Sequence, residues 1–242
     1  MNLVIDQGNS SAKVAIFDHD SILVVNSYEL LTIDLINELF ERYIITATLL
    51  CSVIKLDPSI KEALNQHSSY FIELDHTTPL PITNGYATPE TLGKDRIAAA
   101  VGANYLKPEA NLLIIDVGTA ITYDFVSDAN EYLGGNISPG TDIRFKSLHQ
   151  FTDKLPLVEM QQTASTIGKT TVDAISSGVI QGILFEIEGY ITLFRQMYPA
   201  LSVFLTGRGS IRFAATLKKP IFAEINLVLI GLNRILTYNA QL

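Results

Sequence analysis

The sequence runs Val4-Ile5-Asp6-Gln7-Gly8-Asn9 near its start and Ile114-Ile115-Asp116-Val117-Gly118-Thr119 near its middle. After each glycine come a β-rich run, a polar turn and a further strand, so each copy reads as strand, turn, strand, turn, strand. The copies lie roughly 110 residues apart, far longer than a solenoid repeat and close to the size of a domain. The sequence therefore predicts two homologous domains, residues 1–111 and 112–242.

The segments outside the two copies predict the remaining elements of each domain. Hydrophobic spacing and capping signals indicate helices over 32–43, 58–64 and 94–105, strands over 44–53 and 70–74, and an irregular loop over 76–93. In the second half they indicate one or two helices within 165–198, a strand over 201–206 and a last helix over 224–238. Hairpins combined with helices in this way predict two mixed α/β layers with a cleft between the domains.

Composition excludes several classes of protein. A net charge of -8, without clusters of Lys and Arg, argues against a nucleic-acid partner. Cys51 is the single cysteine, so an internal disulfide is impossible and we expect it in the core. The start, Met1–Asp6, lacks a basic region, and the apolar segment Val179–Phe194 carries Glu186 and Glu188. We therefore expect no secretion signal, no membrane span and a cytoplasmic location, with 179–194 as a buried amphipathic helix.

An aspartate at the end of a strand, followed by glycine, is suited to binding phosphate. The glycine lets the backbone approach the ligand, and the carboxylate handles a metal ion. Asp6 and Asp116 are both placed in this way, and the first copy adds Asn9, Ser10 and Lys13. A single Asp-x-Gly also marks ordinary turns, and a strand lysine is often only solvated. The duplication favours phosphate binding.

The segment Gly93-Lys94-Asp95-Arg96 closes the irregular loop and opens an alanine-rich helix. An acid in the first turn of a helix also interacts favourably with the helix dipole, which is the structural alternative. In the functional interpretation Asp95 accepts or aims a hydroxyl proton, and Arg96 holds substrate or developing negative charge.

Two further segments are rich in glycine. Tyr132-Leu133-Gly134-Gly135-Asn136-Ile137-Ser138-Pro139-Gly140 permits a close approach of backbone to ligand, and Thr206-Gly207-Arg208-Gly209 follows an apolar strand. The second can pass beneath an adenine or a ribose. Both can equally be plain turns.

Together these features resemble the superfamily of actin, sugar kinases and heat-shock ATPases, which implies two ribonuclease H-like domains with ATP in the cleft between them. More narrowly, the chain resembles the type III pantothenate kinase family in the order and spacing of its motifs from end to end. The segments that carry this resemblance are Asp6–Ser10 with Lys13, Gly93–Arg96, Asp116–Thr122 and Gly134–Gly140. The implied reaction converts ATP and pantothenate into ADP and 4′-phosphopantothenate, the first step of coenzyme A biosynthesis.

The resemblance also implies the site residues. For ATP these are Asp6, Gln7, Gly8, Asn9, Ser10, Ser11, Ala12, Lys13, Thr119, Thr206 and Gly207. For pantothenate they are Tyr86, Gly93, Lys94, Asp95, Arg96 and Thr171, with Asp95 as proton acceptor. Mg²⁺ would bind near Asp6 through the phosphates, and Asp116 would bind a monovalent cation, K⁺ or NH₄⁺. The family further implies a homodimer, for which the helix over 179–194 could supply the interface.

Two positions depart from the family pattern. Gly207-Arg208 stands where a Gly-Gly pair is usual, which puts nucleotide affinity in doubt, and Lys94 is larger than the residue often found there, although its side chain could point to solvent. The rival interpretations are another small-molecule kinase, a phosphohydrolase of the same superfamily, and an ATP-binding regulatory protein without catalysis.

Overall fold

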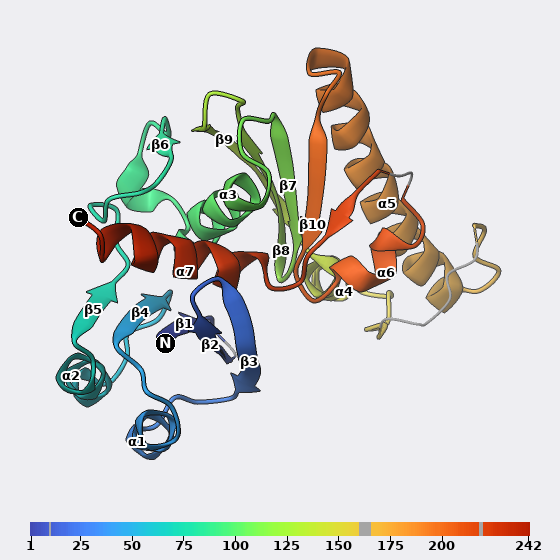
Figure 1. The fold of residues 1–242 in the computed structure, drawn as a ribbon. Coiled ribbons are helices and arrows are strands. Elements are labelled where there is room, and N and C mark those ends of the chain that lie inside the picture. Colours follow the sequence, from blue (N-terminus) through green and yellow to red (C-terminus); the bar gives the residue numbers. More distant parts are fainter. Residues whose placement is uncertain (10, 160–165, 218–219) are drawn as a thin grey trace. The chain divides into compact units, whose positions relative to one another are not determined.

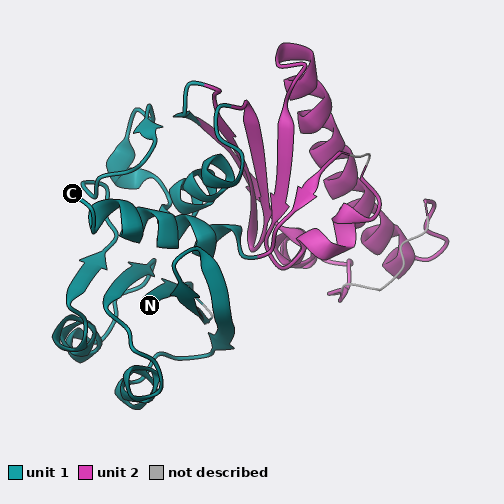
Figure 2. Cartoon of the chain, in the orientation of Figure 1, with its two compact units in different colours: residues 1–109, 129–133, 226–242 teal, residues 110–128, 134–225 magenta. Residues whose placement is uncertain are grey.

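The computed structural model describes residues 1–9, 11–159, 166–217 and 220–242. Contacts divide the chain into two compact units (Figure 2). Unit 1 contains residues 1–109, 129–133 and 226–242, and unit 2 contains residues 110–128 and 134–225. The sequence assigns 226–242 to the second domain, whereas in the structure this segment belongs to unit 1, because its helix packs against elements of that unit.

Unit 1 is built on a five-stranded sheet of order β3-β2-β1-β4-β5 (Figure 1). The strands of this sheet are β1 (Asn2–Gln7), β2 (Ala12–Asp18), β3 (Ser21–Tyr28), β4 (Ala47–Ser52) and β5 (Tyr70–Glu73). The two-residue β6 (Thr83–Asn84) also belongs to unit 1 but lies outside this sheet. The helices of unit 1 are α1 (Ile33–Arg42), α2 (Pro58–His67), a short 3₁₀ helix (Pro89–Thr91), α3 (Lys94–Leu106) and α7 (Leu227–Asn239). The helices expected over 32–43, 58–64 and 94–105 are thus α1, α2 and α3.

The two faces of β1 serve different purposes. Leu3 and Ile5 join a buried cluster with residues of α1 and α2. Because neighbouring side chains alternate between the faces of a strand, Asn2, Val4 and Asp6 face the other side. There Asn2 Nδ2 donates to Asn233 Oδ1 of α7 at 2.8 Å. The Asp6 side chain therefore points to the face that carries α7.

Helices α3 and α7 pack against each other through backbone contacts. A Cβ atom added at Gly231 would lie 1.8 Å from the carbonyl oxygen of Ala98, and one added at Gly102 would lie 2.3 Å from that of Leu227. Only glycine fits at both positions. This packing explains why α3 is rich in alanine and almost wholly buried, and it fixes the helix that begins with the Gly93–Arg96 segment.

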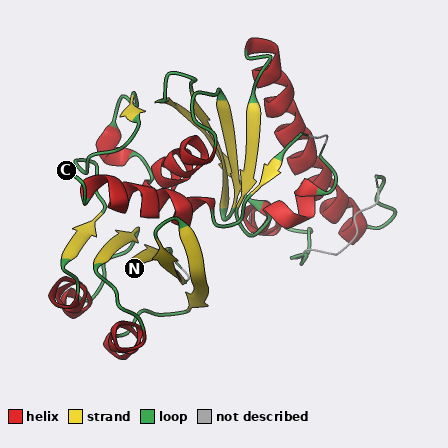
Figure 3. Ribbon diagram, in the orientation of Figure 1, coloured by secondary structure: helices red, strands yellow, loops and turns green. Residues whose placement is uncertain are grey.

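Unit 2 repeats the sheet order of unit 1. Its strands are β7 (Leu112–Val117), β8 (Ala120–Val126), β9 (Glu131–Pro139), β10 (Ser202–Thr206) and β11 (Phe222–Ala223), and its helices are α4 (Thr141–Gln150), α5 (Thr171–Met197) and α6 (Ser210–Ala214) (Figure 3). Read from β9, the order is β9-β8-β7-β10-β11, the counterpart of β3-β2-β1-β4-β5, and β6 adds a sixth strand beside β9. In both units a hairpin of the first two strands is followed by a parallel strand beside the first. The predicted internal repeat therefore extends to the topology.

A polar network holds α4 and α5 to the sheet of unit 2. Tyr123 Oη on β8 donates to Glu186 of α5 at 2.9 Å, and Arg144 of α4 donates to the other carboxylate oxygen of Glu186. Arg144 also donates to the carbonyl oxygen of Pro139 at 2.8 Å and to Ser138 Oγ at 2.9 Å. Around this network lies the main cluster of apolar side chains of the unit. The network therefore fixes the end of β9, where the glycine-rich segment finishes.

Several elements differ from the sequence predictions. Residues 134–139 belong to strand β9, where we expected a turn-rich segment after a strand. Helices α4 and α6 and strand β11 were not predicted. The expected helix over 179–194 is part of α5, where Ile183 and Ile187 are fully buried but Phe185 and Leu193 are exposed. In the described part of the chain, none of the helices combines the length and apolar content that crossing a bilayer requires.

Candidate functional site

In unit 1 the β1–β2 hairpin places Lys13 directly opposite Asp6. The register pairs Asp6 with Lys13 on β2 and with Cys51 on β4. Paired residues of neighbouring strands share a face of the sheet, so the three side chains stand in a row. The turn is closed by a hydrogen bond from Gly8 N to the carbonyl oxygen of Ser11 at 3.0 Å. Lys13 is therefore part of the site formed with Asp6, and Cys51 is fully buried beneath it.

The first turn of α3 approaches the same row. Asp95 Oδ1 accepts a hydrogen bond from Arg96 N at 2.9 Å, and a Cβ atom at Gly93 would lie 2.6 Å from this oxygen. Glycine at 93 thus leaves room for the Asp95 carboxylate. Lys94 Nζ donates to the carbonyl oxygen of Ser52 at 3.3 Å, at the end of β4. Lys94 therefore ties α3 to the sheet of unit 1, contrary to the expectation that it could point to solvent.

The charges of Asp95 and Lys13 both act on the Asp6 carboxyl group. Burial, and then the negative charge of Asp95, raise the pKa of Asp6 from 3.8 to about 6, while Lys13 lowers it by a smaller amount. Burial, Asp6 and Asp95 likewise raise the pKa of Cys51, against the opposing effect of Lys94. The carboxylates of Asp6 and Asp95 therefore lie near enough to repel each other, and this repulsion favours the binding of a cation beside them.

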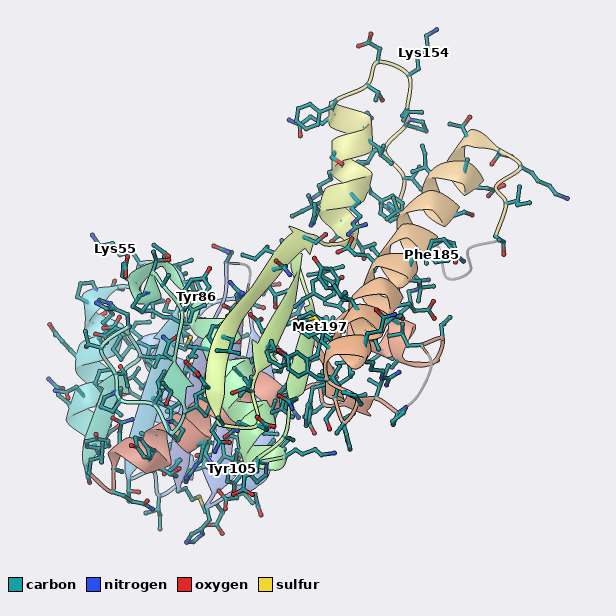
Figure 4. The ribbon with its side chains drawn as sticks, turned by 90° about the horizontal axis from the view of Figure 1, so that it is seen from above. Lys55, Tyr86, Tyr105, Lys154, Phe185 and Met197 are labelled. Atoms are coloured by element: carbon teal, nitrogen blue, oxygen red, sulfur yellow. The ribbon has the colours of Figure 1, made fainter. Side chains whose placement is uncertain are left out.

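Tyr86 and Arg96 lie together beside this acidic pair. Arg96 is buried, and its guanidinium carbon lies 5.8 Å from the centre of the Tyr86 ring, a cation–π contact. The Tyr86 ring is also 6.0 Å from the buried ring of Tyr132 at the start of β9. Figure 4 shows Tyr86 among the side chains of unit 1. The family resemblance implied that Tyr86 and Arg96 both border the pantothenate site, but neither their mutual contact nor the contact with Tyr132 was predicted.

In unit 2 Asp116 stands at the end of β7 beside two threonines. The register pairs it with Thr206 on β10 and with Thr122 on β8. Thr122 Oγ1 is buried and has no hydrogen-bond partner among the described residues. Gly207 has a φ of +86°, and a Cβ atom there would lie 2.3 Å from Asp116 Oδ1. The Thr206-Gly207 turn therefore lies against the Asp116 carboxylate. This contact within unit 2 requires glycine at position 207, because any larger residue would collide with the carboxylate.

The glycine-rich segment, residues 132–140, ends in contact with the hairpin formed by β7 and β8. Gly140 N donates to the carbonyl oxygen of Thr119 at 3.0 Å, and a Cβ atom at Gly140 would lie 2.3 Å from the same oxygen. Gly118 N closes the hairpin by donating to the carbonyl oxygen of Ala120 at 3.0 Å. Thr119 itself is exposed at the tip of the turn. The close backbone approach that the sequence indicated at Gly140 is thus made to the hairpin.

Thr171 begins α5 and borders a cavity of about 610 Å³ in unit 2. The polar residues of its lining are Arg144, Ser147 and Thr171, and the apolar ones include Leu148 and Ile175. Thr170 caps the helix by accepting from Asp173 N at 3.1 Å, so Thr171 is the first helical residue. Its exposed side chain is therefore held in place by a well-capped helix.

The remaining predicted residues lie in or near the first turn of the β1–β2 hairpin. Gln7 is buried, and its Nε2 donates to the carbonyl oxygen of Gly8 at 2.8 Å. Asn9 is exposed and Ala12 is buried, while Ser10 lies outside the described residues.

In unit 2, Arg208 stands where the family usually has the second glycine of a Gly-Gly pair. It is exposed and lies two residues after the end of β10. Its position leaves the Asp116–Gly207 contact intact.

The donor groups fit the metal ions that the resemblance implied. No three side chains of His, Cys, Asp or Glu gather into a metal site within the described ranges. Mg²⁺ often binds through one or two carboxylates and substrate phosphates, which the Asp6 and Asp95 pair suits. At Asp116, the carboxylate and the buried Thr122 hydroxyl, unpartnered among the described residues, are both hard oxygen donors, which suit an alkali cation.

The repeated sheet order and the two hairpins define the fold class as that of the actin-like ATPases and sugar kinases. Among solved structures, the inorganic polyphosphate/ATP-glucomannokinase of Arthrobacter sp. strain KM aligns with a TM-score of 0.50 at 14% identity, covering 98% of each chain. A Baf-family protein from Campylobacter jejuni aligns with a TM-score of 0.62 at 24% identity, covering 99% of this chain and 100% of that one. These likenesses confirm the predicted fold of two ribonuclease H-like domains.

Sequence comparison identifies the family. The model described as type III pantothenate kinase matches residues 2–193. The type III pantothenate kinase of Phocaeicola vulgatus is 49% identical over 242 residues, 100% of both chains. The chain therefore belongs to the type III pantothenate kinase family, whose reaction is the first step of coenzyme A biosynthesis. The family predicted from the motifs is thus confirmed.

Proposed function

We propose that the chain transfers the terminal phosphate of ATP to the primary hydroxyl of pantothenate, with Asp95 as the residue that accepts or aims the hydroxyl proton. The observation that carries the proposal is that the hairpin register pairs Lys13 with Asp6, while the Lys94–Ser52 hydrogen bond holds the first turn of α3, with Asp95, against the same sheet. The raised pKa of Asp6 agrees with this arrangement. A phosphate-binding hairpin and a second carboxylate at one place are what phosphoryl transfer to a hydroxyl requires.

In the proposed mechanism the residues of unit 1 have separate tasks. The backbone of the β1–β2 turn and Lys13 hold the phosphates of ATP. Asp95 orients the pantothenate hydroxyl for in-line attack on the γ-phosphorus, and Arg96, braced by Tyr86, holds the substrate. Bound Mg²⁺ supplies neutralisation of phosphate charge near Asp6. Lys94 would act by fixing the first turn of α3, as its bond to Ser52 suggests.

The experiment that tests this assignment is the Asp95→Asn variant. We expect it to fold and to bind ATP but to lose roughly two to four orders of magnitude in turnover, as removal of a general base does. A coupled ADP-release assay with and without pantothenate measures the loss. Undiminished turnover would refute the role of Asp95, and equal ATP hydrolysis without pantothenate would favour a phosphohydrolase. Tight ATP binding without phosphorylation of pantothenate would favour a regulatory protein.

We further propose that Asp116, with Thr122, binds a monovalent cation, K⁺ or NH₄⁺, and that Thr119, Thr206 and Gly207 contribute to the nucleotide site. The buried Thr122 hydroxyl, which has no hydrogen-bond partner in the described part of the chain, supports the cation assignment. Activity in buffer containing only Na⁺ should fall well below that in K⁺ or NH₄⁺. Equal activity in all three buffers would contradict the proposal.

We also propose that the active enzyme is a cytoplasmic homodimer in which α5 forms the interface and Thr171 contacts pantothenate. Exposed apolar residues on this helix, Phe185 (65%), Leu193 (51%) and Met197 (59%), support an interface there; Figure 4 labels Phe185 and Met197. The Phe185→Glu variant should then be monomeric by light scattering. Ile44→Glu, at an 83% exposed residue of unit 1, is the matched control and should remain dimeric. A dimeric Phe185→Glu protein would exclude this face.

A further inference from the structure

We infer that Asn130, together with Asn104 of α3, is a positioning residue for pantothenate, because it fixes the loop that carries Tyr86 to the helix that carries Arg96. The inference rests on the proposed substrate role of Tyr86 and Arg96. All of the residues concerned belong to unit 1.

Asn130 makes three hydrogen bonds from a tight turn. Its carbonyl oxygen accepts from Thr83 N at 3.0 Å, and its side-chain oxygen accepts from Asn104 Nδ2 at 2.6 Å and from Glu109 N at 3.4 Å. The φ of Asn130 is +59°, in the left-handed region, which asparagine adopts more readily than most residues. One residue therefore joins the loop, the end of α3 and the turn before β9.

The loop continues from this contact along the start of β9. Strand β6 pairs Thr83 with Glu131 and Asn84 with Tyr132 in parallel, and Gly85 N donates to the carbonyl oxygen of Tyr132 at 2.9 Å. A Cβ atom at Gly85 would lie 3.1 Å from the carbonyl oxygen of Tyr132 and 2.7 Å from a carboxylate oxygen of Glu131, so glycine eases this close approach. The residue after Gly85 is Tyr86, and its position is thus set by residues 130–132.

Helix α3 offers one face to this assembly. Arg96, Ala100 and Asn104 are spaced four residues apart and lie on the same side of the helix. At one end of that face Arg96 contacts the ring of Tyr86, and at the other end Asn104 binds Asn130. The loop is therefore anchored at two points of a single helix. Loss of the Asn104–Asn130 bond would let Tyr86 move relative to Arg96 without altering either residue.

The variants that test this inference separate side chain from backbone. Asn130→Gly keeps the left-handed backbone and removes the side-chain acceptor, and Asn104→Leu removes the donor at similar volume. Asn130→Asp keeps an acceptor oxygen and should rescue the wild-type behaviour. Asn233→Leu is the matched control, because Asn233 is a buried asparagine of the same unit that binds Asn2 and the carbonyl oxygen of His19, away from the loop.

We expect Asn130→Gly and Asn104→Leu each to raise the KM for pantothenate by roughly tenfold, the factor expected for one lost, partly buried hydrogen bond. The kcat and the KM for ATP should change less than about twofold. The double variant should add little to either single one, because both remove the same bond. Amide hydrogen exchange over residues 80–90 should become faster in both variants and stay unchanged in Asn233→Leu.

An unchanged KM for pantothenate in Asn130→Gly and Asn104→Leu would overturn the inference, as would equal changes in all kinetic constants in these variants and in Asn233→Leu. If the wild-type chain phosphorylates no pantothenate, the proposed function fails instead. Hydrogen exchange remains decisive in that case, because unaltered exchange over 80–90 in both variants would show that the asparagine pair does not hold the loop.

Discussion

Replacing Asp6 with asparagine is expected to stabilise the protein at alkaline pH while it abolishes turnover. Burial and the charge of Asp95 raise the pKa of Asp6 from 3.8 to about 6, and Lys13 offsets part of this effect. The folded chain therefore holds the proton more tightly than the unfolded chain does. The resulting stability is fully present below a pH of about 4 and is lost as the pH rises to about 6.

The size of the effect follows from the shift in pKa. A shift of about two units corresponds to about 3 kcal/mol of unfolding free energy. Asparagine carries no charge at any pH, so at a pH of about 8 the Asp6→Asn variant should be more stable than the wild type by up to about 3 kcal/mol. For a chain of this length the corresponding rise in Tm is up to roughly 10 °C. Under acidic conditions, where the wild-type carboxyl is neutral, the gain should vanish.

The assay is thermal unfolding followed by far-UV circular dichroism, with EDTA and without nucleotide. Wild type and Asp6→Asn are compared at several pH values, so that the responses of all other groups cancel. In an Asp95→Asn background the gain from Asp6→Asn should shrink, because the second cause of the raised pKa is absent, and in a Lys13→Met background it should grow. A gain of equal size at acidic and alkaline pH, or a loss at alkaline pH, would refute this explanation.

Three other predictions concern packing and the second hairpin. Gly231→Ala should lower the free energy of unfolding by roughly 3 kcal/mol through overpacking of α3 on α7, whereas Gly189→Ala, at an open helical position, should be neutral or stabilising in the same urea titration. Thr122→Val should raise the K⁺ concentration needed for half-maximal activity roughly three- to tenfold, and Thr122→Ser should not. Gly207→Ala should raise the KM for ATP and weaken the K⁺ response, because the methyl group would displace the Asp116 carboxylate; unchanged kinetics would contradict the contact.

The hairpins could be predicted from the sequence because their signals are local. An apolar strand that ends at Asp-x-Gly specifies the strand, the turn and the position of the carboxylate within a few residues. Lys13 was expected near the phosphates on the same basis, and the register places it opposite Asp6. Helix α4 was missed because Phe145 is its only buried residue, so it lacks a strong apolar stripe.

Features that depend on contacts distant in sequence could not be predicted. Helix α7 belongs to unit 1 because Gly231 allows it to approach α3, and no pattern within 224–238 contains that information. The pairing of Thr83 with Glu131 likewise joins segments that are far apart in the chain. The bond from Lys94 to Ser52 is of the same kind. Individual side chains could be assigned to the site, but the elements that hold them had to be observed.

The two hairpins share a topology but present different charges to a ligand. Opposite Asp6 the register places Lys13, a cation, whereas opposite Asp116 it places the neutral hydroxyl of Thr122. A lysine beside a carboxylate supports the binding of phosphate oxygens, because it offsets the negative charge of the acid. The residue facing Asp116 instead carries a buried hydroxyl that has no hydrogen-bond partner among the described residues, so its oxygen is a suitable donor to a cation. We therefore propose that the residue facing the aspartate, Lys13 in one copy of the repeat and Thr122 in the other, favours phosphate binding in the first copy and cation binding in the second.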